Sequence, residues 1–274
     1  NGEASPGSVI FVCDKLCGMR FCYDATRFGS GLEEAVELAA DRGMTACEYS
    51  FDAFNDAPGG EVLEGSASGE SSAAFAIDKL SDVEEEHLRS VAALCQERNV
   101  EISCLRLNQQ VKVSDEKSVA NFNATINNLA LIAKALDCKR IVFYLYPESS
   151  ESWLDSVERV LVPIVEKLSQ AGIRLVLSTG TAAAYRGSSL RNWRPLEPQE
   201  WRNLIAHVPD LFLSFSVADC AWQGIDYLRI LPNLVSAIDH VEAQDVEVMR
   251  NIISDSGYFG PLFWRYKTVG KGQV

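Results

Sequence analysis

The sequence of 274 residues predicts an α/β fold, a TIM-type (β/α) barrel with seven visible strands. From residue 19 onward, apolar runs alternate with amphipathic segments almost to the end of the sequence. The runs are apolar nearly throughout rather than at every second position, which is typical of parallel strands covered on both faces. Seven successive strand–helix steps favour a barrel over a doubly wound sheet, because no glycine-rich phosphate turn follows the first strand.

Each strand is expected where an apolar, β-branched run lies between turn residues, and each helix where apolar residues recur at helical spacing. The helix at 30–43 has acidic residues in its first turn and a glycine at its end, as helix termini prefer. The segment 58–72, rich in Gly, Ser and acidic residues, is expected to be an exposed loop. The predicted strands are 19–24, 46–52, 100–107, 139–147, 173–180, 211–219 and 238–245. The predicted helices are 30–43, 82–99, 116–138, 152–172, 198–210 and 225–237.

One strand of the barrel is unaccounted for, because a barrel of this type closes with eight. The expected source is a continuation of the chain beyond Val274. The alternative is closure by the apolar run "SVIFVCDKL" at residues 8–16. The predicted organisation is an N-terminal extension at 1–18 and a C-terminally incomplete barrel at 19–274.

Composition limits the partners. The formal net charge is −13 (25 Lys and Arg against 38 Asp and Glu), so no nucleic acid or anionic membrane is expected as a partner. No apolar run approaches the roughly 20 residues needed to span a bilayer, and the first residues do not resemble a signal peptide. The eight scattered cysteines suit reduced, buried thiols, and the expected location is the cytoplasm.

In a TIM barrel, functional side chains follow the carboxyl ends of the strands. The stretches "GLEEAVELAADRGMTACEYSFD", "LALIAKALDCKRIVF", "WQGIDYLRILPNLVSAIDHVEAQDVEV" and "FWRYKTVGKGQV" resemble the xylose isomerase-like TIM barrels, specifically the sugar phosphate isomerase/epimerase group, of which this chain is identified as a divergent member. The last two stretches correspond to "WQGIDY…HVHAKD" and "WWRYRLPGKGEVDW" in the family. Because the sequence stops within the latter motif, a continuation is the favoured source of the eighth strand.

The resemblance implies that the family's divalent metal site is lost. Family members hold the metal with a Glu, an Asp, a His and a Glu at the ends of strands five to eight, and the ion polarises a sugar carbonyl. Here these positions are Ser178, Ser216 and Glu242, and the fourth lies beyond Val274. Two serine hydroxyls are weak neutral ligands, so no metal ligand is assigned at this site and no cofactor is expected.

The candidate site residues are those that follow the predicted strands and the aromatic and basic residues near them. Glu242 and Asp219 are the candidate catalytic acid and base. His240 is a candidate for substrate binding, and a structural role is the stronger alternative because it lies beside an apolar strand residue. Arginines suit anionic substituents and aromatic rings suit sugar faces. The candidate substrate-binding residues are Arg106, Tyr144, Trp222, His240, Trp264, Arg265 and Lys267.

Three functions stay open. The leading hypothesis is a metal-site-deficient barrel that binds a small carbohydrate-like ligand without metal-dependent isomerisation. The second is an active isomerase or epimerase that uses Glu242 and Asp219, with or without a Mn, Mg, Co or Zn ion relocated to a carboxylate-rich pocket of Glu242, Asp219, Glu148 and Glu48. The third is a non-catalytic scaffold or interaction module. Assembly as a homo-oligomer is compatible with all three.

Overall fold

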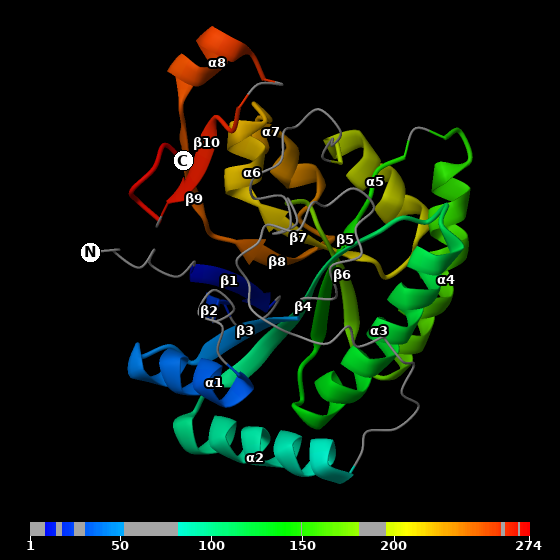
Figure 1. The fold of residues 1–274 in the computed structure, drawn as a ribbon, viewed down its shortest axis with the longest axis vertical. Helices are drawn as coiled ribbons and strands as arrows, with labels where there is room; N and C mark the ends of the chain where they lie inside the picture. The colour runs from blue at the N-terminus through cyan, green and yellow to red at the C-terminus, as the bar shows by residue number, and fades with distance from the viewer. Residues whose placement is uncertain are drawn as a thin grey trace.

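The architecture is a closed eight-stranded barrel, seen in a computed structural model that describes residues 9–14, 18–24, 31–51, 82–148, 150–180, 196–258, 261–267 and 269–274 (Figure 1). The predicted loop at 58–72 lies outside these residues. The barrel strands are β1 Val9–Asp14, β2 Gly18–Asp24, β3 Ala46–Phe51, β4 Glu101–Val111, β5 Arg140–Leu145, β6 Arg174–Ser178, β7 Phe212–Ser216 and β8 Ile238–Glu242. The helices around it are α1 Leu32–Asp41, α2 Asp82–Arg98, α3 Glu116–Ala135, α4 Trp153–Gln170, α5 Pro198–His207, α6 Val217–Trp222 and α7 Tyr227–Ile230.

The strand that closes the barrel is N-terminal. From β2 to β8, each strand pairs in parallel with the next one. Strand β1 pairs antiparallel with β2 on one side and with β8 on the other. The favoured expectation, closure by residues beyond Val274, is therefore corrected: the run "SVIFVCDKL" supplies the strand. Antiparallel pairing satisfies the backbone groups on both open edges, which a barrel requires. The strand comes from the segment predicted as an extension.

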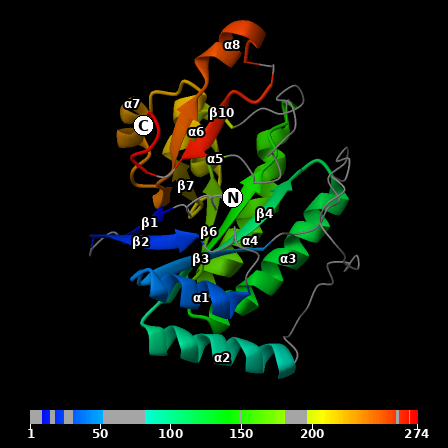
Figure 2. The same cartoon turned by 60° about the vertical axis from the view of Figure 1, so that its left-hand side comes forward.

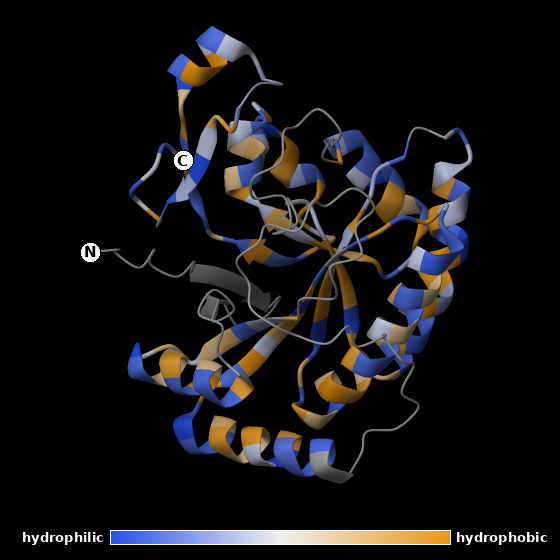
Figure 3. Ribbon diagram, viewed as in Figure 1, coloured by the Kyte–Doolittle hydropathy of each residue, from blue (hydrophilic) through white to orange (hydrophobic). Residues whose placement is uncertain are grey.

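The apolar residues of the strands and helices form one core between the barrel and its helical layer. Strand residues of one parity, such as Leu105, Phe143 and Leu175, face outward and join this core. Helix α4 adds buried residues at intervals of three or four, including Val157, Leu161 and Val165. Burying each such side chain stabilises the fold by about 1.5–3 kcal/mol before entropy is counted. Figure 3 shows orange central strands beside helices that carry both orange and blue residues.

Three differences from the predicted boundaries bear on the site. The strand expected at 211–219 ends at Ser216, whose hydroxyl caps α6 at once by accepting from the backbone N–H of Asp219. The helix expected at 225–237 is split into α7 and the 3₁₀ turn Leu231–Asn233, because Pro232 cannot donate a helical hydrogen bond. The strand expected at 238–245 divides into β8 and a separate strand.

That separate strand, β9 Asp245–Val248, pairs antiparallel with β10 Trp264–Lys267 outside the barrel, and helix α8 Arg250–Ser256 connects them. Figure 2 shows this hairpin extending beyond the barrel near α6. In the described part of the chain, no helix has both the length and the apolar character needed to cross a bilayer.

The carboxylate of Asp245 fastens the C-terminal residues to the hairpin. It accepts backbone hydrogen bonds from Val246, Gly270, Gly272 and Val274, at 2.8, 3.1, 2.8 and 2.9 Å. Burial alone would raise the pKa of Asp245, but these four donors outweigh it and lower the pKa.

Substituting Gly272→Ala is expected to detach this segment. A Cβ at Gly272 would lie 2.2 Å from Oδ1 of Asp245 and 2.6 Å from the carbonyl oxygen of Val246, so the backbone must move away from the carboxylate. Hydrogen exchange at the amide of Val274 should rise at least roughly tenfold, since a lost charge-assisted hydrogen bond is worth about 1.5–3 kcal/mol. Gly257→Ala, which meets no neighbouring atom but keeps a positive φ of 71°, is the control for strain alone and should leave this exchange unchanged. Equal protection of Val274 in wild type and Gly272→Ala would contradict the prediction.

Candidate functional site

The inner residues at the carboxyl ends of the strands are mostly polar. Because side chains alternate along a strand, the residues next to the outward apolar ones point into the barrel. One layer inside is apolar and consists of Cys104, Val142 and Val176 with Phe212 packed against it. The polar groups at the carboxyl end of the barrel are Glu48, Arg106, Tyr144, Ser178, Ser214, Ser216, His240 and Glu242.

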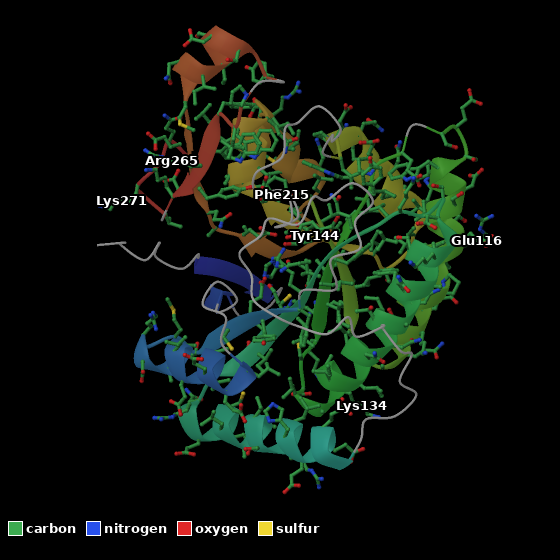
Figure 4. All side chains as sticks on the ribbon, viewed as in Figure 1. Glu116, Lys134, Tyr144, Phe215, Arg265 and Lys271 are labelled. Carbon is green, nitrogen blue, oxygen red and sulfur yellow. The ribbon has the colours of Figure 1, made fainter. Side chains whose placement is uncertain are left out.

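Arg106 connects three strands. Its Nε donates to Oε1 of Glu48, and its Nη1 donates to the hydroxyl of Tyr144 at 2.8 Å and to Oε1 of Glu242 at 2.9 Å. The guanidinium also lies 5.7 Å from the centroid of the Tyr144 ring, within range of a cation–π contact. Figure 4 shows Tyr144 at the centre of the barrel. The fork of donors on one arginine therefore fixes β3, β5 and β8 relative to β4.

Glu242 is the member of this group that reaches solvent, with 14 % of its side chain exposed. Its Oε1 accepts from Arg106, from the hydroxyl of Ser178 at 3.1 Å and from the hydroxyl of Ser214 at 3.0 Å. The backbone N–H of Gly180 in turn donates to Ser178 at 3.1 Å. Three donors on one oxygen suit an ionised carboxylate.

Behind Glu242 lies a fully buried chain of polar contacts. Ser214 Oγ lies 2.7 Å from Nδ1 of His240, and Nε2 of His240 lies 3.1 Å from Oε2 of Glu48. Burial would raise the pKa of Glu48, but Arg106 and His240 outweigh it and lower the pKa to about 2. Burial raises the pKa of Tyr144 despite the opposing effect of Arg106. Glu48 is thus held as a carboxylate and Tyr144 as a neutral phenol.

Asp219 forms a second carboxylate centre on α6. It accepts from the hydroxyl of Ser216, from the indole N–H of Trp222 at 2.9 Å and from the hydroxyl of Tyr266 at 2.8 Å. Burial raises the pKa of Asp219, the charge of Glu242 adds to the rise, and the hydrogen bonds oppose it. Gly180 lies between the two centres, and a Cβ there would be 3.0 Å from Oδ2 of Asp219.

Asp219→Asn is expected to change the free energy of unfolding little at neutral pH, whereas Asp219→Ala is expected to lower it clearly. Asparagine keeps an oxygen that accepts from Trp222 and Tyr266, whereas alanine leaves both donors without it, at about 1–3 kcal/mol for each buried group. Because the folded-state pKa is raised, protonated Asp219 favours folding below the unfolded pKa, and this contribution is lost as pH rises through the folded pKa. Urea unfolding at neutral pH and at low pH measures both effects. Alanine equal to asparagine would contradict the prediction.

The structure brings together only part of the set predicted from sequence. Arg106, Tyr144, His240 and Glu242 share one network, and Asp219 with Trp222 forms its neighbour. The Trp222 ring stacks on Trp264, with centroids 4.0 Å apart and an interplanar angle of 7°, inside a small apolar cluster with Phe263.

The two basic residues of the hairpin lie elsewhere. Arg265 and Lys267 both pair with Glu247, the latter at 2.9 Å, and Figure 4 shows Arg265 away from Tyr144. Glu148 accepts from the backbone and the hydroxyl of Ser114. The pocket expected from Glu48, Asp219, Glu148 and Glu242 is therefore not a metal-sized cluster among the described residues.

The residues that correspond to family metal ligands do not fit a divalent ion. The hydroxyls of Ser178 and Ser216 donate to Glu242 and Asp219, respectively, so each serine proton is directed at a carboxylate. A serine that donates in this way offers at most a weak neutral oxygen, and hard divalent ions collect anionic ligands.

One residue of the network, Ser214, and one residue of the apolar layer beneath it, Cys104, were not identified as inward-facing from the sequence. Ser214 and Cys104 lie within apolar runs, and only the alternation of side chains along β7 and β4 shows that they face inward. The available signal was side-chain alternation: Ser214 lies two residues before Ser216, and Cys104 lies two residues before Arg106, so each pair faces the same side of its strand.

No protein-family model and no curated protein sequence matches this chain. Solved structures do. A xylose isomerase domain protein from Planctomyces limnophilus is 15 % identical, with a TM-score of 0.61 over 90 % of this chain and 78 % of that chain. The IOLI protein with a bound zinc atom is 15 % identical, with a TM-score of 0.56 over 82 % and 73 %. A D-psicose 3-epimerase solved in the presence of D-fructose is 10 % identical, with a TM-score of 0.54 over 76 % and 66 %. At these identities the likeness shows the fold alone, and that fold is an α/β TIM-type barrel like those of the xylose isomerase domain proteins.

Proposed function

We propose that this chain binds a small, polyhydroxylated, carbohydrate-like ligand at the mouth of the barrel, without a metal ion at the position that the family resemblance implies. The observation that carries the proposal is the use of Ser178 and Ser216 as hydrogen-bond donors to Glu242 and Asp219. Because these hydroxyls already donate to the two carboxylates, a cation at these positions would gain no anionic ligand from the serines.

The groups at the mouth suit hydroxyl recognition. Glu242 is partly exposed, so its oxygens are placed to accept from ligand hydroxyls, and its position is fixed by Arg106. Nη2 of Arg106 is buried and has no hydrogen-bond partner within the described part of the chain, so it is an unused donor of the same guanidinium that holds Glu242. Two similar folds are described with an epimerase activity on a sugar or with a zinc ion, and they support a sugar-like ligand by analogy of fold only.

Calorimetric titration with a panel of aldoses, ketoses and their phosphates tests the proposal. We expect one class to bind equally with and without added Mg²⁺ or Mn²⁺, and Glu242→Gln to weaken binding at least roughly tenfold, the cost of a charged hydrogen bond. Glu247→Gln on the hairpin is the matched control and should bind as the wild type does. Binding that requires an added divalent ion would contradict the proposal, and absence of binding across the panel would favour a scaffold.

A second candidate is metal-independent proton transfer between adjacent carbons of a sugar. It is favoured by two neighbouring carboxyl groups in different environments, Asp219 with its raised pKa and Glu242 with three donors. The carboxylate would remove a proton from the carbon next to the carbonyl, and the acid would return one to the former carbonyl carbon, while the hydroxyl proton passes from the adjoining oxygen to the former carbonyl oxygen. Incorporation of solvent deuterium at carbon, followed by NMR, should be lost in both Asp219→Asn and Glu242→Gln. Deuterium incorporation that survives both substitutions would exclude this candidate.

A further inference from the structure

Below the mouth, three side chains place metal-ligand atoms close together. Oxygen of Glu48, sulfur of Cys104 and nitrogen of His240 all lie within 4.8 Å of one another, and all three residues are buried. Glu48 and Cys104 are paired neighbours on β3 and β4, and His240 reaches them from β8. This group is separate from the positions of Ser178, Ser216 and Glu242.

Two atoms of the group are buried without a hydrogen-bond partner. They are Oε2 of Glu48 and Nε2 of His240, on side chains with no exposed surface, and they lie 3.1 Å apart. An unsatisfied buried polar atom costs about 1–3 kcal/mol, and more when the group is charged. Two such atoms that face each other indicate that a further species belongs between them.

The hydrogen bonds of Ser214 with Glu242 and His240 indicate that this species is positively charged. Oε1 of Glu242 accepts, so the single proton of Ser214 is directed to it. Nδ1 of His240, 2.7 Å from Ser214 Oγ, must then be the donor in that contact. With that N–H on Nδ1, Nε2 meets the carboxylate oxygen of Glu48 either through a second proton or through a metal ion that its lone pair binds. Without one of these cations, the contact of the lone pair with the carboxylate is repulsive.

We infer that Glu48, Cys104 and His240 bind one divalent metal ion of the zinc type. Bonds of about 2.0–2.2 Å to two atoms 3.1 Å apart enclose an angle of about 95°, which a zinc or cobalt site accommodates. A thiolate, an imidazole and a carboxylate together favour Zn²⁺ over Mg²⁺ or Ca²⁺.

The neighbouring groups supply the outer contacts that such a site needs. Arg106 donates to the other oxygen of Glu48, and Ser214 accepts from the other nitrogen of His240. With the thiolate formed, the negative charges of Glu48, Cys104 and Glu242 balance the guanidinium and the divalent ion. The ion would thus complete a neutral cluster.

Cobalt titration of the chelator-treated chain tests the inference without any sugar ligand, so its outcome is independent of the proposed function. We expect one equivalent of Co²⁺ to bind, with a sulfur-to-cobalt charge-transfer band, and Zn²⁺ to displace it. Cys104→Ser should remove that band and weaken metal binding more than roughly tenfold. Cys47→Ser, an equally buried thiol that faces the outer core on the neighbouring strand, is the matched control and should keep both.

Two results would overturn the inference. One is a folded wild-type chain that takes up no stoichiometric Co²⁺ or Zn²⁺ and whose ¹⁵N NMR spectrum shows both nitrogens of His240 protonated. The species between His240 and Glu48 would then be a proton and not a metal ion. The other is a charge-transfer band that persists in Cys104→Ser. Should that variant fail to fold, zinc-edge X-ray absorption of the zinc-loaded wild type decides: one sulfur neighbour supports the site, and none excludes it.

Discussion

Arg106→Leu is expected to lower the free energy of unfolding by about 3–5 kcal/mol, the largest effect of any single substitution proposed for this chain. The guanidinium is buried and is the cation that faces both Glu48 and Glu242. Leucine would leave the charge of Glu48 fully buried with only His240 beside it. Removing one partner of a buried ion pair exposes the other to its full desolvation cost.

Urea unfolding at neutral pH measures this effect. Arg106→Lys keeps one charge but lacks the fork that serves Glu48, Tyr144 and Glu242 at once, so its loss should be smaller but clear. Arg265→Leu is the matched control. Its side chain is 59 % exposed, and such surface pairs contribute about 0–1 kcal/mol. If Arg106→Leu lowered the free energy of unfolding by less than about 1 kcal/mol, the prediction would be contradicted, because water or a rearrangement would then have replaced the contacts of the guanidinium.

Acid should weaken the metal-free protein through Glu48 by about 3.5 kcal/mol. The folded-state pKa is about 2 against an ordinary value of 4.5, a depression of about 2.5 pH units at about 1.4 kcal/mol each. A depressed pKa contributes stability that is complete above pH 4.5 and is lost as pH falls toward 2. Between these values the unfolded chain binds the proton more readily than the folded chain, so protonation favours unfolding.

Comparison with Glu48→Gln isolates this contribution. The variant should be less stable at neutral pH, because it cannot neutralise Arg106, yet its unfolding free energy should fall less between pH 5 and pH 2. Glu33→Gln, a substitution at a half-exposed carboxylate on α1, should keep the wild-type slope. Parallel pH profiles for wild type and Glu48→Gln would mean that other carboxyl groups dominate acid unfolding.

Most of the fold was predictable because its main signal is local. Apolar runs and amphipathic helices identified β2 to β8 in order, and the strand ends identified Arg106, Tyr144 and Glu242 as neighbours. Closure by β1 was not the favoured prediction, since nothing in a short apolar run specifies that its partners lie on two strands, one of them far along the chain.

The rest of the site was less predictable because it depends on pairings between distant residues. The stacking of Trp222 on Trp264 and the tyrosine contact to Asp219 arise only when the hairpin of β9 and β10 docks near α6. Parity along β4 and β7, rather than residue type, decides that Cys104 and Ser214 face inward. Sequence patterns identify strand ends well, but they identify interior polar chains poorly when the residues are small.

The antiparallel first strand has a consequence for the order of assembly. Its pairing with β8 joins Phe11 to Val241, residues about 230 positions apart, so the last seam of the barrel is among the most non-local contacts of the fold. Contacts of this kind form slowly, because the loop entropy is lost before they are made. During synthesis β1 leaves the ribosome before the other barrel strands, and until β8 follows it can pair only with β2. Until β8 arrives, unpaired backbone edges are open to other chains. Refolding should therefore be slow and concentration-sensitive, and a peptide with the sequence of β1 should compete for the seam.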